Sequence, residues 1–216
     1  KGIEWIRLHY LYPSNFPMEL IDLMLSNEKI CRYIDIPIQH ISDSVLKSMR
    51  RAHNSKETMS LLNEIRRRMP DAAIRTTVIA GHPGETEKDF SELLDFIKTF
   101  RFDRLGAFAY SHEEDTYGYI HYADDVPEKV KEKRVELIMN TQQDISAENN
   151  EKALGRIMKV IIDRREGVFY VGRSMYDSPD VDQEILVTSP VKIEPGTFIN
   201  VKITGSGEYD LYAEAL

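Results

Sequence analysis

Two hydrophobic patterns alternate along the first 125 residues of the chain. Apolar side chains spaced by two predict strands, whereas apolar side chains spaced by three and four predict helices. The strand-like segments are residues 3–10, 33–38, 72–80 and 102–110, and the helix-like segments are residues 17–24, 42–49, 56–69 and 86–100. A repeated order of strand and helix predicts a parallel sheet with helices packed outside it. These strands are about half of those in a complete eight-stranded barrel, so the sequence predicts an open sheet or a partial barrel.

The pattern changes near residue 150. Residues 127–151 form a long polar helix, and five short strand-like segments follow at residues 157–162, 168–173, 184–188, 198–204 and 210–213. Gly, Pro and Asp separate these segments, which is typical of a small antiparallel β-barrel of the OB-like kind. The expected fold is therefore an α/β domain at residues 1–150 and a β-barrel domain at residues 151–216. We expect them to be separate folding units that join near Gly155.

Composition narrows the class of protein. No apolar run reaches the roughly 18–20 residues that a membrane helix needs. The single cysteine, Cys31, cannot form an internal disulfide, which favours a reducing, cytoplasmic setting and a buried thiol. The formal net charge is −8, without the basic character usual in nucleic-acid-binding proteins. The chain opens on a strand-like segment with no Met before it, which indicates a piece of a longer protein.

Polar residues and glycines follow several of the predicted strands. Gln39 and Tyr110 each follow a strand, and Gly81, Gly84 and Glu85 lie between a strand and a helix. Open α/β sheets bind ligands at the carboxyl ends of their strands, and glycines there let the backbone approach a ligand. An ordinary strand-to-helix turn and a Gln bonded to neighbouring backbone are equally compatible with the pattern. The six histidines lack metal-ligand spacing, and neither a phosphate-binding Walker loop nor a G-x-S-x-G motif is present.

Four longer motifs are more specific. They are WIRLHYLYP at residues 5–13, DIPIQH at 35–40, TVIAGHPGETEKDF at 77–90 and FDRLGAFAYS at 102–111. Together with residues 42–51, these motifs resemble the methylthiotransferase branch of the radical S-adenosylmethionine (SAM) enzymes. The resemblance implies part of a radical SAM barrel followed by a TRAM domain. It also implies a transferase that uses SAM and two 4Fe-4S clusters, whose cysteine ligands are not in this chain.

Two groups compete within that branch. One group modifies adenosine in tRNA, and the other adds a methylthio group to the β-carbon of an aspartate of ribosomal protein S-12. Residues 172–187 and the run from Arg75 to Thr77 are similar to the second group. By position, the resemblance assigns the SAM pocket to Gln39, Arg51, Arg75, Thr77, Gly81, Gly84 and Glu85. His82 and the loop at residues 115–118 depart from the family pattern, which leaves the substrate-side loop after Tyr110 open.

The charge of the terminal module bears on the partner. From Ser174 to Leu216 the chain has two basic and eight acidic side chains. Such a module repels phosphate and attracts a basic protein, so we expect ribosomal protein S-12 rather than tRNA as the partner. The residues expected to face that partner are Tyr110, Arg173, Tyr176, Asp177, Asp180 and Asp182. Three alternatives stay open: a tRNA adenosine methylthiotransferase, a non-catalytic RNA-binding module, and a phosphate-binding α/β enzyme that uses the Gly81–Gly84 loop.

Overall fold

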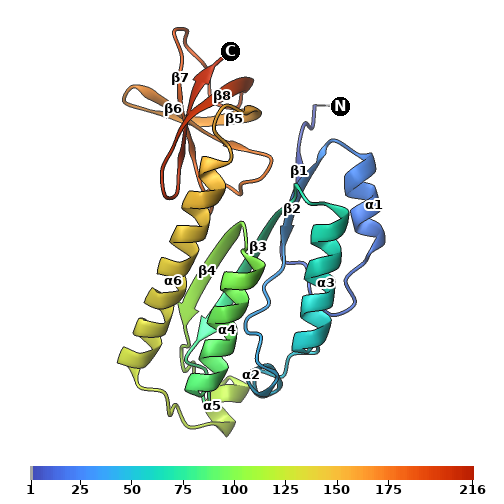
Figure 1. The fold of residues 1–216 in the computed structure, drawn as a ribbon, viewed down its shortest axis with the longest axis vertical. Helices are drawn as coiled ribbons and strands as arrows, with labels where there is room; N and C mark the ends of the chain where they lie inside the picture. The colour runs from blue at the N-terminus through green and yellow to red at the C-terminus, as the bar shows by residue number, and fades with distance from the viewer. Residues whose placement is uncertain (1) are drawn as a thin grey trace.

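The structure, a computed structural model, describes residues 2–216. Figure 1 shows an α/β domain and a β-barrel that are joined by one long helix. The α/β domain contains β1 (Ile6–Leu8), α1 (Glu19–Ser26), β2 (Ile30–Asp35), α2 (Asp43–Ser48), α3 (Ser55–Arg68), β3 (Ala73–Ala80), α4 (Glu87–Phe100), β4 (Arg104–Ala109) and α5 (Tyr117–His121). Helix α6 (Glu128–Glu151) then leads to β5 (Ile157–Glu166), β6 (Phe169–Ser174), β7 (Ile185–Thr188), β8 (Phe198–Ser206) and β9 (Leu211–Ala215).

The sheet of the α/β domain has four parallel strands in the order β1-β2-β3-β4. Alternate side chains of a strand point to opposite faces. On one face, Ile34, Ile74 and Val78 pack with apolar residues of α1, α3, α4 and α6 to form the main core. We call the face opposite the main core the open face; Tyr33, Arg75 and Thr77 are among its residues.

Local sequence explains where the longer helices begin. Asn54 accepts a hydrogen bond from the backbone N–H of Glu57, and Thr86 accepts one from that of Asp89. In both helices the acidic side chain also bonds back to the backbone N–H of the cap, which completes a capping box. The Gly-His-Pro-Gly-Glu sequence before Thr86 thus ends in a strong helix start, as the sequence predicts.

The five terminal strands close into a barrel in the order β5-β6-β7-β9-β8, with its own apolar core. The expectation of a fully antiparallel barrel was wrong in one respect, because β7 and β9 pair in parallel. Strand β9 forms a hairpin with β8 and fills the gap beside β7, so it runs in the same direction as β7. This parallel pair closes the barrel.

Two further findings complete the fold. The sequence did not predict α5, a five-residue helix that Thr116 caps. Within residues 2–216, no helix combines the length and the apolar character that a membrane span requires.

Candidate active site

The turn between β3 and α4 is built around the carboxylate of Glu85. Its Oε2 accepts hydrogen bonds from the backbone N–H groups of Gly81, at 2.7 Å, and His82, at 3.2 Å. Its Oε1 lies 2.9 Å from Nη1 of Arg134 on α6. Burial raises the pKa of Glu85, while these backbone donors and Arg134 act in the opposite direction. In this structure Glu85 therefore fixes the conformation of the turn from the side that packs against α6.

Gly81 and Gly84 of this turn each require glycine, but for different structural reasons. Both have positive φ, at 82° for Gly81 and 79° for Gly84. A Cβ on Gly81 would lie 2.3 Å from Cγ of the buried Lys131, whereas a Cβ on Gly84 would meet nothing within 4 Å. The close approach expected at Gly81 is thus an approach to the stem of Lys131 on α6. Gly84 is required for its backbone conformation.

Gln39 extends the pairing of β2 and β3 beyond the end of β2. Its N–H donates to the carbonyl of Thr77 and its carbonyl accepts from the N–H of Ile79. Its φ of 66° is in the left-handed region, which is uncommon for a residue with a side chain. Thr77 lies on the open face, where its Oγ1 accepts a bond from Arg75. These contacts place Gln39 just beyond the carboxyl end of β2, as the sequence predicts, beside Thr77 within β3.

A cavity of about 280 Å³ opens at the same edge. Two of the predicted site residues, Arg51 and Tyr110, line it together with Ile79, His82 and Tyr117. Arg51 donates to the phenol of Tyr12 at 2.8 Å, and no carboxylate among residues 2–216 pairs with it. The ring of Tyr110 packs edge-on against that of His82, with centroids 5.0 Å apart. The cavity thus offers flat apolar walls beside a guanidinium that can bind an anion.

Two basic side chains of α6, Lys131 and Arg134, pack against this edge of the sheet. Lys131 is buried, donates to Asp124 at 2.7 Å and lies over the ring of Tyr110. Burial lowers the pKa of Lys131, but the hydrogen bond and charge of Asp124 outweigh it and raise the pKa overall. The spacing of Lys131 and Arg134 on a polar helix gives no sign that they are buried, so sequence reasoning missed both.

Arg75 lies deeper on the open face and belongs to an ion-pair network. Its Nη1 is 3.2 Å from Oδ1 of Asp35, and its Nε is 3.3 Å from Oδ1 of Asp182. Asp182 comes from the loop between β6 and β7, residues 175–184, which we call the closing loop. On the same loop, Asp177 is buried and pairs with Arg104 of β4. The closing loop thus binds the open face of the sheet.

This placement corrects two of the predicted partner contacts. The side chains of Asp177 and Asp182 are only 1% and 2% exposed, so neither faces a partner in this structure. Their charges are matched by Arg104 and Arg75, which lie more than 70 residues earlier in the chain. Asp180, on the same loop, is exposed with a φ of 65°, and its contact with a partner stays a prediction.

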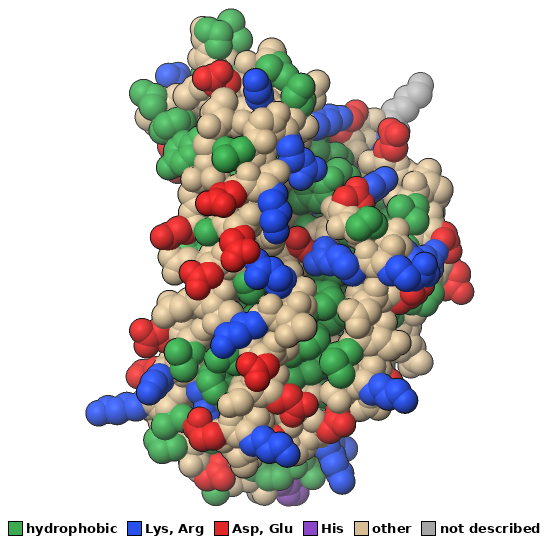
Figure 2. Space-filling view, viewed as in Figure 1, with side chains coloured by type: hydrophobic (Ala, Val, Ile, Leu, Met, Phe, Trp, Pro, Cys, Tyr) green, Lys and Arg blue, Asp and Glu red, His purple; other side chains and the backbone are tan. Residues whose placement is uncertain are grey.

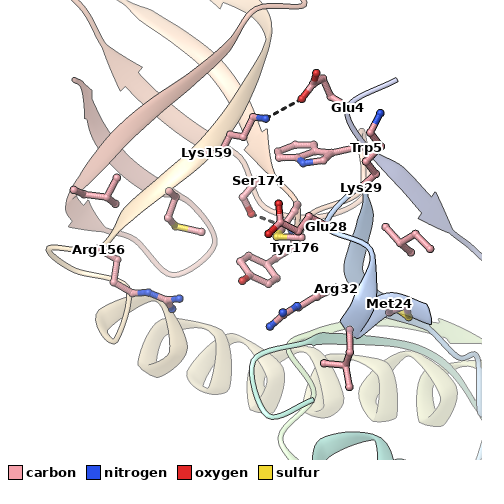
Figure 3. A pocket seen from close by; sticks show the side chains of 15 residues that line it. Glu4, Trp5, Met24, Glu28, Lys29, Arg32, Arg156, Lys159, Ser174 and Tyr176 are labelled. Atoms are coloured by element: carbon pink, nitrogen blue, oxygen red, sulfur yellow. Dashed lines mark hydrogen bonds and ion pairs between the residues drawn. The ribbon is translucent and has the colours of Figure 1, made fainter. Parts of the chain in front are cut away.

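Arg173 and Tyr176 lie toward the seam between the two domains. Arg173 pairs with Asp163 of β5 at 3.0 Å. Tyr176 lines a cleft of about 500 Å³ together with Trp5 and Met24 (Figure 3), and Met175 also lines it. Figure 2 shows basic side chains along this seam. Those that line the cleft are Lys29, Arg32, Arg156 and Lys159, with Glu4 and Glu28 as the acidic residues.

Comparisons with known proteins agree with this architecture. Residues 2–97 match the family model of the radical SAM superfamily, and residues 154–216 match that of the TRAM domain. A protein of Parabacteroides distasonis named ribosomal protein uS12 methylthiotransferase RimO is 51% identical over 100% of this chain and 50% of its own length. The protein of that name from Flavobacterium johnsoniae is 52% identical over 99% of this chain and 49% of its own length. The chain belongs to the radical SAM methylthiotransferase family. It spans about half the length of the curated relatives it matches.

A solved structure supports the fold of this family. Coproporphyrinogen III oxidase (HemN) from Escherichia coli, described as a radical SAM enzyme, superposes with a TM-score of 0.54 at 15% identity. The match covers 79% of this chain and 44% of that chain. At this identity the likeness concerns the fold alone.

The residues at the sheet edge fit SAM, a cofactor of the radical SAM methylthiotransferase family. The flat walls formed by Tyr110 and His82 suit a purine, and the guanidinium of Arg51 suits a carboxylate. The same test of fit gives a different result for iron–sulfur clusters. Thiolates hold such clusters, and the only cysteine, Cys31, is buried. Residues 2–216 contain no group of three or more His, Cys, Asp and Glu side chains that could hold a metal ion.

Proposed function

We propose that the whole protein is a cytoplasmic radical SAM methylthiotransferase that adds a methylthio group to the β-carbon of an aspartate of ribosomal protein S-12. The observation that carries this proposal is the match along the entire chain, at about half identity, to relatives that share the name ribosomal protein uS12 methylthiotransferase RimO. That name specifies ribosomal protein uS12. SAM and iron–sulfur clusters supply the radical and sulfur chemistry in the whole protein.

Within this function, the described residues have binding and positioning roles. Arg51 offers a cation and Tyr110 and His82 offer flat walls for SAM at the sheet edge. Glu85 and Lys131 hold the turn and the ring of Tyr110 in place from the helix side. We also propose that Gln39, Thr77, Gly81 and Gly84 shape the same pocket, with the two glycines acting through the turn's conformation.

The surface charge favours a docking place for S-12 on the barrel away from the seam. The seam is lined by four basic residues, which would repel a basic protein. Asp180, Glu208 and Glu214 are exposed on the barrel domain and can attract one. We therefore propose that S-12 docks near these carboxylates, with tRNA excluded by the same charges.

The test uses the full-length protein, prepared without oxygen and with its clusters reconstituted. It is incubated with SAM, a reductant, a sulfide source and either S-12 or unmodified tRNA. We expect mass spectrometry to find a methylthio group on one aspartate of S-12 and no modification of tRNA. Modified adenosine with unmodified S-12 would replace this proposal with the tRNA activity.

A further inference from the structure

The closing loop brings the barrel domain into contact with three strands of the sheet. Tyr33 of β2 donates to Oδ2 of Asp182 at 2.6 Å, and Arg75 of β3 pairs with Oδ1 of the same carboxylate. Arg104 of β4 pairs with Asp177. Figure 1 shows the barrel end of α6 and the start of the sheet side by side, where this loop crosses. The loop therefore closes one end of the open face.

Asp182 is held rigidly in this position. Besides the bond from Tyr33, its Oδ2 accepts a bond from the backbone N–H of Ser178 at 2.8 Å. Burial raises the pKa of Tyr33, and the charge of Asp182 raises it further, so the phenol stays a donor over the whole physiological range. A carboxylate fixed by two donors can in turn fix a guanidinium.

Arg75 is the group that Asp182 fixes. Asp35 on the neighbouring strand holds Nη1 of Arg75, and Asp182 holds its Nε from the side of the barrel. A Cβ on Gly106 would lie 3.8 Å from Nη2 of Arg75, so the guanidinium extends across β3 toward Gly106 on β4. From β3 it therefore reaches both neighbouring strands, Asp35 on β2 and Gly106 on β4.

The position of Arg75 relates this network to the candidate active site. Residues 75, 77 and 79 of β3 point to the same face, because side chains alternate along a strand. Arg75 donates to Oγ1 of Thr77, and Ile79 lines the cavity at the sheet edge. Along this row, Thr77 lies between Ile79 and Arg75, so Arg75 lies below the site and is joined to it through Thr77.

We propose that Asp182 is a positioning residue for the transferase: it holds Arg75 as the floor of the chamber in which the acceptor aspartate reacts. The barrel domain then contributes to the chamber as well as docking the substrate. The inference rests on the proposed function. Because Asp182 is buried behind Arg75, its loss should change the chemical steps more than the binding of S-12.

The test compares Asp182→Asn with Asp95→Asn, the same change at an exposed position of α4 outside the proposed binding surfaces. In the full-length enzyme we expect Asp182→Asn to lower kcat for S-12 at least tenfold and to change KM less than threefold. We also expect more 5′-deoxyadenosine per methylthiolated product, because a displaced floor lets the acceptor move. Asp95→Asn should match the wild type in kcat and in this ratio.

A second readout does not depend on activity. In NMR spectra of this 216-residue chain, the Nε–H of Arg75 should exchange slowly with water in the wild type and in Asp95→Asn, and quickly in Asp182→Asn. If Asp182→Asn does not fold, Arg75→Lys tests the same contact and should show the same loss of kcat.

The outcomes separate the two proposals. A wild-type enzyme that does not modify S-12 contradicts the proposed function. An active wild type with unchanged kcat and product ratio in Asp182→Asn overturns the inference, even if the variant is less stable, because stability alone would then explain the contact.

Discussion

At the scale of single residues, the glycines of the β3–α4 turn allow a direct comparison. We expect Gly81→Ala to lower the free energy of unfolding by about 3 kcal/mol, because the new Cβ adds a clash with the stem of Lys131 to the strain of positive φ. Gly84→Ala should cost about 1 kcal/mol, from strain alone. Denaturant unfolding of both variants measures the difference. Equal losses would contradict the role assigned to Lys131.

His40 gives a residue-scale prediction about pH. Burial lowers its pKa from 6.5 to about 4, while its Nδ1 accepts a bond from the N–H of Ser42. A histidine with a lowered folded-state pKa stabilises the fold above its unfolded pKa. That stability, about 3 kcal/mol at most, is lost as the pH falls from about 6.5 toward 4. Denaturant unfolding across this range should show the loss, and His40→Asn should reduce its slope.

Other buried titratable groups also make the stability of this chain depend on pH, and they set the background for this measurement. Burial also lowers the pKa of His53 and His82, so His40→Asn should keep a smaller acid sensitivity in the same range. Glu85 acts in the opposite direction, because its raised pKa favours the fold at low pH. An unchanged slope in His40→Asn would show that His40 is not the dominant group.

At the scale of elements, the helices and strands could largely be predicted from the sequence. Amphipathic spacing, the cap at Thr86 and the change of pattern near Gly155 are local signals, and the structure has elements at each of them. Helix α5 was missed because its residues show no apolar periodicity. The closing loop was misread for a different reason: Asp177 and Asp182 look like surface charges until their distant arginines are known.

The start of α4 carries an element-scale prediction. Asp89 accepts bonds from the hydroxyls of Ser42, Ser44 and Thr86, and so ties α4 to α2. Burial raises the pKa of Asp89, but these donors outweigh burial and hold it well below its ordinary value. Asp89→Asn should lower the free energy of unfolding by about 2 kcal/mol, measured at neutral pH. Glu57→Gln, at the same position of α3, contacts only its own cap and should cost less than about 1 kcal/mol.

The candidate site could be predicted only in part at this scale. The resemblance assigned Arg51 to the SAM pocket and the strand pattern placed Tyr110 at a strand end, and both residues line the cavity at the sheet edge. Gly81 and Glu85 lie at the same edge, but their contacts run to each other and to α6. A sequence shows which residues follow a strand, whereas the direction of a turn depends on the helix that packs behind it.

At the scale of the whole molecule, the two domains are joined by more than helix α6. Their apolar cores are separate, yet Asp177, Asp182 and the backbone of Ser174 bind side chains of the sheet, and Trp5 packs edge-on against Phe198 of the barrel. Removing one partner of a buried ion pair leaves a costly unpaired charge. These contacts argue against the expectation of independent folding units.

Calorimetry of this chain tests that coupling. We expect the wild type to unfold in a single transition, because neither domain can separate without exposing the buried carboxylates of the closing loop. Arg104→Gln leaves Asp177 buried without its guanidinium, so it should destabilise the contact by about 3 kcal/mol and split the transition in two. Arg164→Gln removes an exposed ion pair within the barrel domain and should leave one transition. Two transitions in the wild type would instead support separate folding units and would show that the ion pairs of the closing loop contribute little to joining them.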